Sequence, residues 1–176
     1  MSLLEPGILK DDDPQVSSIL SSLTQVSAIL KDDFLPFMPK LMDKLLWDVV
    51  ADVDFKLEDN EIEALNAPTA TNEGVTSITV QMKGVEGNKK LSLNTNALEA
   101  KITSVQVLKE LTKNLGSSFY EYIEPTWNQL KQVFDYKYSK NVRENVWETC
   151  QYLIEACIDH STKAALFGAM LPSFKH

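Results

Sequence analysis

The stretch that decides the fold is FLPFMPKLMDKLLWDV at residues 34–49, because a related pattern, FYEYIEPTWNQLKQVF, returns at residues 119–134, 85 positions later. A shorter offset of 42 residues places Lys101 on Arg143. Helical pairs that recur at about 40–47 residues are typical of HEAT and armadillo repeats. The sequence therefore predicts an all-α fold, an α-α superhelix of HEAT or armadillo repeats (a solenoid), with an insertion that lengthens the larger offset.

Helix start and stop signals divide the chain into repeat units. Asp13 and Pro14 fit the N-cap and first position of a helix, and Asn96 with Glu99 forms a capping box. Apolar residues then recur at helical spacing in each unit. We expect alternating B and A helices, with B helices at residues 14–30, 96–115 and 141–159, A helices at residues 34–51 and 118–138, and a truncated A helix at residues 161–172.

The helical period stops between residues 52 and 95, which we interpret as an insertion between two paired helices. Its first part, Asp52–Glu73, is acidic and predicts a mobile surface excursion. Thr76–Met82 then alternates apolar and polar residues, and Leu91 and Leu93 do so after a turn that contains glycine. This alternation predicts a short β-hairpin.

The overall charge limits the class of partner. The 176 residues carry a net charge of −8, the pI is near 4.8, and 44% of the residues are hydrophobic. An acidic surface repels phosphates, so we expect no nucleic-acid partner and favour a basic one. We find no apolar run long enough to cross a bilayer and no signal-peptide pattern at Met1–Lys10, and expect no membrane insertion.

The two cysteines, Cys150 and Cys157, are seven residues apart on one expected helix. That spacing is about 10 Å along a helix axis, which exceeds the reach of a disulfide. We interpret them as reduced, buried core residues and expect a soluble, intracellular protein.

The sequence offers no constellation of catalytic residues. His160 and His176 have no cysteine, serine or carboxylate at the spacing of a triad or metal site. Gly84 and Gly87 are not followed by the helix of a phosphate loop, and Asp11–Asp13 lacks the ligand spacing of a calcium loop. We therefore expect no enzyme, no catalytic residues, no cofactor and no metal.

Several motifs resemble one family in their order along the chain. Asp13–Ser17 before a helix, followed by Phe34–Pro39, is similar to importin-β-type karyopherins, closest to the karyopherin-β3 (importin beta-3) group. Leu98–Lys101 resembles the opening of a B helix in that group. Phe119–Ile123 and Asn141–Arg143 resemble the next A helix and the start of its B helix, and the insertion is placed similarly.

The resemblance implies a right-handed superhelix with A helices outside and B helices on the concave face. It also implies three partners: basic nuclear-localisation signals of cargo proteins, the Ran GTPase, and phenylalanine-glycine nucleoporins that contact the outer A helices. We expect the acidic residues on the exposed sides of the three B helices to attract a basic peptide.

Two sets of residues are candidates for these contacts. On the A helix at 118–138, an apolar stripe either packs against neighbouring helices, which we favour, or contributes a pocket for phenylalanine side chains; we expect Trp147 to be core. We expect Lys101 and Arg143, at one repeat position, to make structural contacts with acidic neighbours. The nucleoporin-contact candidates are Trp127, Leu130, Phe134 and Tyr138, and the cargo-binding candidates are Gln106, Glu110, Glu144, Glu148, Gln151 and Glu155.

Two functions remain open at this point. We expect a segment of a nuclear transport receptor that binds nuclear-localisation signals, carries cargo through the nuclear pore under Ran control, and shuttles between cytoplasm and nucleus. The alternative is a HEAT-repeat scaffold subunit, of phosphatase regulatory or chromosome-organising type, with no transport role. The insertion favours the receptor, and the unpaired first helix and short last helix lead us to expect a central piece of a longer protein.

Overall fold

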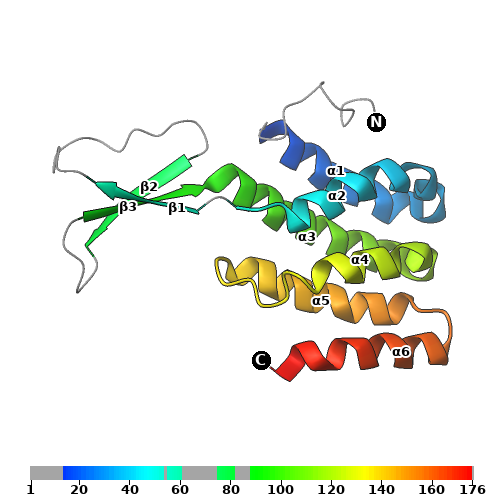
Figure 1. Ribbon diagram of the computed structural model, residues 1–176. Coiled ribbons are helices and arrows are strands. Elements are labelled where there is room, and N and C mark those ends of the chain that lie inside the picture. Colours follow the sequence, from blue (N-terminus) through cyan, green and yellow to red (C-terminus); the bar gives the residue numbers. More distant parts are fainter. Residues whose placement is uncertain (1–13, 54, 61–74, 82–87, 176) are drawn as a thin grey trace.

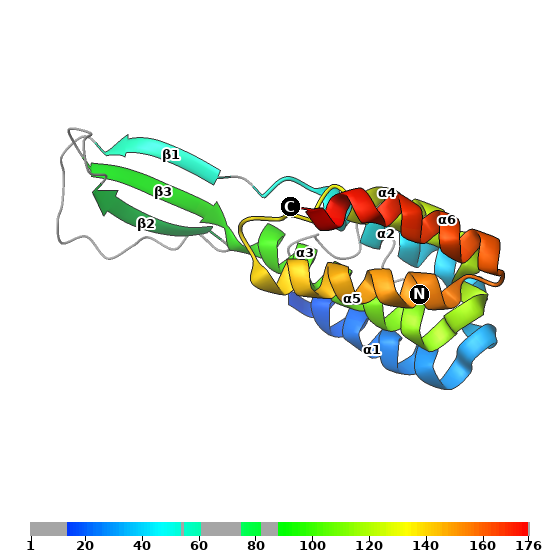
Figure 2. The same ribbon diagram turned by 90° about the horizontal axis from the view of Figure 1, so that it is seen from below.

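The computed structural model describes residues 14–53, 55–60, 75–81 and 88–175. Its helices stack in two layers, with α1, α3 and α5 side by side in one and α2, α4 and α6 in the other (Figures 1 and 2). This arrangement confirms the expected array of helical pairs. The helices are α1 (Pro14–Leu30), α2 (Met38–Val50), α3 (Thr95–Leu115), α4 (Ile123–Leu130), α5 (Lys140–Ala156) and α6 (His160–Met170).

Polar side chains cap three of these helices. Asn94 Oδ1 accepts from the backbone N–H of Ala97 at 3.0 Å, so α3 begins one residue before the expected start. Ser139 caps α5, and Asp159 accepts from Thr162 at 2.8 Å and caps α6. The hydrogen bonds from Thr162 hold the pKa of Asp159 below its ordinary value.

The first two A helices are shorter than expected because each of them opens as a 3₁₀-helix. These openings are η2 (Lys31–Phe37) and η3 (Gly116–Tyr122), so the α-helical parts begin only at Met38 and Ile123. Proline lacks a backbone N–H and fits only early in an α-helix, which agrees with Pro36 inside η2.

The expected C-terminal bounds of two helices are also wrong. Past Leu130 the chain folds into successive turns up to Ser139, which bury both Val133 and Phe134. Helix α5 ends at Ala156, and the extended backbone at Cys157 frees Asp159 to cap the next helix. Helix α6 passes directly into a last 3₁₀-helix, η4 (Leu171–Lys175).

The repeat is visible in the backbone at the turns between B and A helices. Lys31 and Gly116, which lie 85 positions apart, have φ angles of 51° and 52°. Both follow a B helix directly, so the two turns share a left-handed residue at the same repeat position. Lys31 Nζ also donates to the carbonyl of Asn114 at 3.0 Å, which joins the first turn to α3.

The insertion contains a three-stranded antiparallel sheet that projects from the helical body (Figures 1 and 2). Strands β2 (Val75–Gln81) and β3 (Asn88–Asn94) pair at the place of the expected hairpin, and β1 (Phe55–Asn60) pairs with the other edge of β3. Strand β1 corrects the expectation of an unstructured acidic excursion there. The rest of that excursion, residues 61–74, and the glycine turn at residues 82–87 lie outside the described residues.

The acidic stretch of β1 pairs with a lysine-containing stretch of β3. In the register of the two strands, Glu58 is opposite Lys90 and Asp59 is opposite Lys89. These lysines lie some thirty residues later in the sequence, outside the acidic stretch itself.

The core lies between the two helical layers. Fully buried side chains come from both, including Phe34, Leu45, Leu108, Phe119 and Leu153. Within the described residues, no helix combines the length and apolar character that a membrane crossing requires. Cys150 and Cys157 are both free and buried, as expected.

Gly116 should not tolerate a side chain, because its φ of 52° and ψ of −126° are rarely adopted by L-residues. Gly116→Ala is expected to lower the free energy of unfolding by about 1–3 kcal/mol in urea denaturation. An added Cβ meets nothing within 4 Å at Gly116 or at Gly168 in α6. Gly168→Ala is therefore the control and should leave stability unchanged or raise it slightly. Equal losses in the two variants would contradict the backbone explanation.

Burial raises the pKa of the Cys150 thiol from 9.0 to about 12. Above pH 9.0 the unfolded chain releases this proton while the folded chain keeps it, so stability falls as pH rises. The expected contribution is up to about 1.4 kcal/mol per pH unit. Urea denaturation of wild type and Cys150→Ala under reducing conditions, from neutral to alkaline pH, should show a shallower decline in the variant. Parallel declines would contradict the assignment.

Candidate functional site

The six cargo-binding candidates lie on two adjacent helices. Gln106 and Glu110 project from α3, and Glu144, Glu148, Gln151 and Glu155 project from α5; all are exposed except Glu110, which is partly exposed. Helices α3 and α5 pack side by side, so the structure brings the six residues onto one polar face. We call these six residues the α3–α5 face.

Basic residues neutralise much of the α3–α5 face. Lys109 Nζ lies 2.8 Å from Asn145 Oδ1 and 3.0 Å from Glu148 Oε2, and 3.8 Å from Glu110 Oε1. Lys140 pairs with Glu144 at 2.9 Å, and Gln151 donates to Glu155 at 3.0 Å. The carboxylates of this face therefore have neighbours of their own, and the face is less acidic than the sequence suggested.

The first B helix adds no charge to this surface. Helix α1 contains no acidic or basic residue, so the expectation of acidic side chains on all three B helices is wrong for it. The Ser22 hydroxyl donates to the Ser18 carbonyl at 2.8 Å, and Ser27 accepts from Asn114 of α3 at 3.1 Å. Candidate recognition of a basic peptide is therefore confined to α3 and α5.

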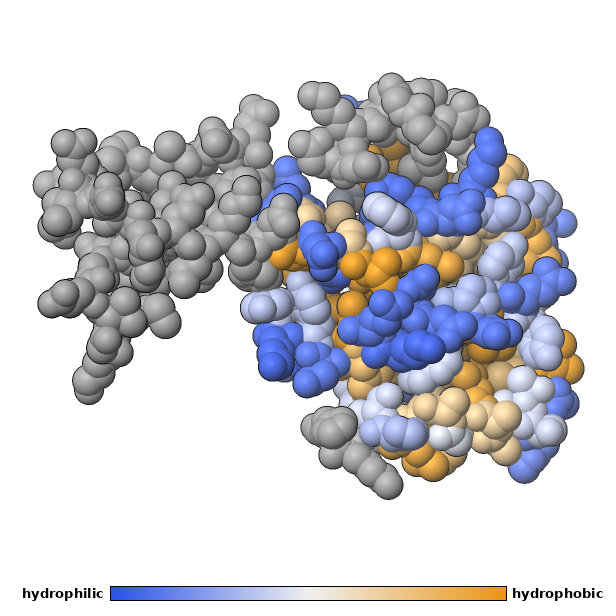
Figure 3. Space-filling model, in the orientation of Figure 1, coloured by the Kyte–Doolittle hydropathy of each residue, from blue (hydrophilic) through white to orange (hydrophobic). Residues whose placement is uncertain are grey.

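Three of the four nucleoporin-contact candidates belong to the core. Trp127, Leu130 and Phe134 are 8%, 0% and 6% exposed, whereas Tyr138 is 58% exposed. The interpretation that these side chains pack against neighbouring helices therefore holds for Trp127, Leu130 and Phe134. The layer of α2, α4 and α6 faces the viewer in Figure 3, and hydrophilic side chains cover the middle of that face.

Trp147 was expected in the core, but the structure leaves it 43% exposed. Its ring contacts Phe134 with centroids 4.4 Å apart, so one side is packed and the other is open. The residue that shares its repeat position, Val105, is fully buried. The helices that carry the two residues differ in their neighbours: α3 lies between α1 and α5, whereas α5 has a described B helix on one side only.

Lys101 and Arg143 have equivalent roles at the ends of the A helices. The Lys101 ammonium, 2% exposed, donates to the Val49 carbonyl near the end of α2 and lies 5.3 Å from the centroid of the Tyr136 ring. Arg143 Nη1 donates to the Tyr136 carbonyl at 2.8 Å, in the segment after α4. The expected contacts are therefore structural, and their first partners are backbone carbonyls.

Two carboxylates surround the Lys101 ammonium. Burial lowers the pKa of Lys101, and the negative charges of Asp52 and Asp48 oppose that effect. Asp48 is itself buried and pairs with Lys44 at 2.8 Å and with the Ser104 hydroxyl at 2.8 Å. This polar cluster links α2 to α3 beside the point where the chain leaves for the sheet.

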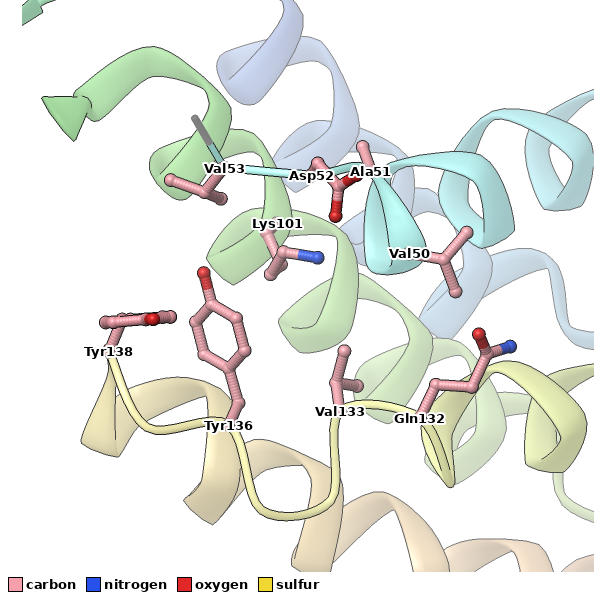
Figure 4. A pocket seen from close by; sticks show the side chains of 9 residues that line it. All are labelled: Val50, Ala51, Asp52, Val53, Lys101, Gln132, Val133, Tyr136 and Tyr138. Atoms are coloured by element: carbon pink, nitrogen blue, oxygen red, sulfur yellow. The ribbon is translucent and has the colours of Figure 1, made fainter. Parts of the chain in front are cut away.

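A pocket of about 390 Å³ opens next to this cluster, where the chain enters the insertion (Figure 4). In Figure 4 the Asp52 carboxylate and the Tyr136 hydroxyl both point toward Lys101. The Tyr136 hydroxyl is buried and has no hydrogen-bond partner. This pocket could not be predicted from the sequence, since its walls include segments about eighty residues apart. Its lining residues are Val50, Ala51, Asp52, Val53, Lys101, Gln132, Val133, Tyr136 and Tyr138.

Among the described residues, no group of three or more histidine, cysteine, aspartate or glutamate side chains is arranged to hold a metal ion.

Two layers of antiparallel helices, with a basic B-helix residue against the end of each preceding A helix, define a HEAT-repeat solenoid segment. No protein-family model matches the chain. Importin subunit beta-3 of Saccharomyces cerevisiae (strain ATCC 204508 / S288c) is 26% identical over 127 residues, which cover 72% of this chain and 11% of that protein.

Solved structures of the karyopherin Kap121p have the same fold. Kap121p bound to RanGTP matches with a TM-score of 0.73 at 21% identity, covering 97% of this chain and 16% of that one. Kap121p bound to Pho4p matches with a TM-score of 0.68 at 22% identity, covering 93% and 15%. The resemblance of this chain to importin-β-type karyopherins is confirmed, over about a tenth to a sixth of the length of these relatives.

Lys101→Met should lower the free energy of unfolding by about 1–3 kcal/mol, because the Val49 carbonyl loses its donor and Asp48 and Asp52 lose a nearby positive charge. Urea denaturation at neutral pH measures the change. Lys113→Met is the matched control: Lys113 is exposed and lies 5.9 Å from the Tyr152 ring centroid, so its loss should change stability little. Unchanged stability in Lys101→Met would show that the buried ammonium is not structural.

Proposed function

We propose that this chain is a segment of a nuclear transport receptor that binds basic nuclear-localisation signals of cargo proteins. The likeness to importin subunit beta-3 over 72% of the chain carries the proposal. The structural match to Kap121p, which extends over 97% of this chain and so includes the insertion, supports it. The binding step needs no catalytic group and uses the receptor's surface alone.

The α3–α5 face is the surface on which we place the cargo contact. It carries four carboxylates, from Glu110, Glu144, Glu148 and Glu155, all of which reach solvent. A lysine of the cargo would compete with Lys109 and Lys140 for Glu148 and Glu144. In the free receptor, Glu148 and Glu144 are paired with these two lysines. The affinity for cargo is limited, because each new ion pair with a cargo lysine replaces an existing one.

Control by the Ran GTPase and shuttling between cytoplasm and nucleus belong to the same proposal. Kap121p has been crystallised with RanGTP and with Pho4p, so one relative of this fold binds a GTPase and other proteins. We assign no Ran contact to particular residues. Contact with phenylalanine-glycine nucleoporins finds no support at Trp127, Leu130 or Phe134, which are buried.

The alternative function, a HEAT-repeat scaffold, does not account for the insertion between α2 and α3. A scaffold of simple repeats needs only short turns between paired helices, whereas here a three-stranded sheet separates α2 from α3. The named relatives are an importin subunit and a karyopherin, which favours the transport receptor.

The cargo surface can be tested with a fluorescein-labelled, lysine-rich nuclear-localisation peptide in a fluorescence polarisation assay. We expect weak binding that falls as salt rises, because exposed charge pairs are screened. Replacing Glu144, Glu148 and Glu155 by lysine should weaken binding by about tenfold or more, since it removes three of the four carboxylates of the face.

The matched control carries the same change in net charge on the other layer. Asp43, Glu121 and Glu124 are exposed on or near α2 and α4, and their replacement by lysine should weaken binding much less. Equal losses in the two triple variants would show that only net charge matters. Binding that ignores both salt and the reversals would remove the α3–α5 face as the cargo surface.

A further inference from the structure

The pocket beside the insertion contains polar groups that the fold itself does not satisfy. The Tyr136 hydroxyl is buried without a hydrogen-bond partner, although a buried polar group is normally paired. The Asp52 carboxylate points into the same space, and it forms no ion pair in the described part of the chain. Both groups line one pocket of about 390 Å³, so a single ligand can reach both.

The pocket offers hydrogen-bond acceptors to a cationic ligand, although its two charged lining residues, Asp52 and Lys101, have opposite signs. One wall is the C-terminal end of α2, from Val50 to Val53, where backbone carbonyls give a partial negative charge. The Lys101 ammonium at the inner side is already bound to the Val49 carbonyl, and Lys44 is bound to Asp48. Asp52 is attracted to Lys101 but forms no ion pair with it, so the Asp52 carboxylate can still accept hydrogen bonds from a ligand.

The two tyrosine side chains of the pocket favour a planar cation. Tyr136 and Tyr138 meet edge to face, with ring centroids 5.5 Å apart, and Tyr138 is 58% exposed. A planar guanidinium can stack on an open tyrosine face while its N–H groups donate to a carboxylate and a hydroxyl oxygen. A compact ammonium lacks both the stacking surface and the fork of donors.

We propose that this pocket binds the arginine side chain of a partner protein. The guanidinium donates to the Asp52 carboxylate and to the Tyr136 hydroxyl oxygen, and stacks on Tyr138. The arginine has to come from outside the given sequence, because Arg143 is its only arginine and is bound to the Tyr136 carbonyl. None of the pocket's lining residues belongs to the α3–α5 face, so this is a second recognition site on the chain.

The probe is Nα-acetyl-arginine amide, compared by ¹H–¹⁵N NMR titration with the corresponding citrulline and lysine derivatives. Citrulline keeps the shape of arginine and loses the charge, whereas lysine keeps the charge and loses the planar fork. We expect arginine to shift the amide signals of residues 50–53 and 132–138, and to bind about tenfold or more tightly than either analogue. Equal binding of citrulline or of lysine would overturn the guanidinium assignment.

Two substitutions test the named partners. Asp52→Asn should reduce arginine binding to the level of citrulline, and Tyr136→Phe should weaken it while leaving the apolar wall in place. Asp43→Asn removes an exposed carboxylate of α2 that does not line the pocket and should have no effect. Undiminished binding to Asp52→Asn, no binding to wild type, or signal changes confined to α5 would each overturn the proposal. Failure of the lysine-rich peptide assay would leave it unaffected, since that assay probes the other face.

Discussion

The buried ammonium of Lys101 is the interaction on which the join between the helical array and its insertion depends. Helix α2 ends at Val50, and the next helix of the array begins only after a sheet. Lys101 of α3 donates to the Val49 carbonyl near the end of α2 and lies over the Tyr136 ring. One side chain thereby ties α2, α3 and the segment after α4 together, even though the sequence between the first two is interrupted.

The contact of Lys101 with the end of α2 also explains why the helical repeat continues after the insertion. The array needs each B helix to return against its own A helix, whatever lies between them in sequence. Lys101 and Arg143 make that connection in successive units, and Lys31 and Gly116 make the left-handed turn out of the B helices α1 and α3. The geometry therefore repeats at the contacts between helices, while the connecting segments differ greatly in length.

The sequence predicted the helical layers because periodic apolar positions decide burial, and Phe34, Phe119 and Leu153 are indeed core residues. It did not predict β1, because the lysines opposite Glu58 and Asp59 lie far along the chain. The charge of the α3–α5 face was overestimated for a similar reason, since Lys109 reaches across from α3 to Glu148 on α5. Pairings between distant segments, including the pocket at Asp52, depend on tertiary packing that a linear pattern does not contain.

Strand β3 ends at Asn94 and helix α3 begins at Thr95, so no linker separates sheet from helix. Asn94 is both the last strand residue and the helix cap, and a change of angle at this residue would break the cap. The orientation of the sheet is therefore coupled to the first turn of α3, the helix at the centre of the array. A contact made on the insertion would reach the α3–α5 face through this one helix.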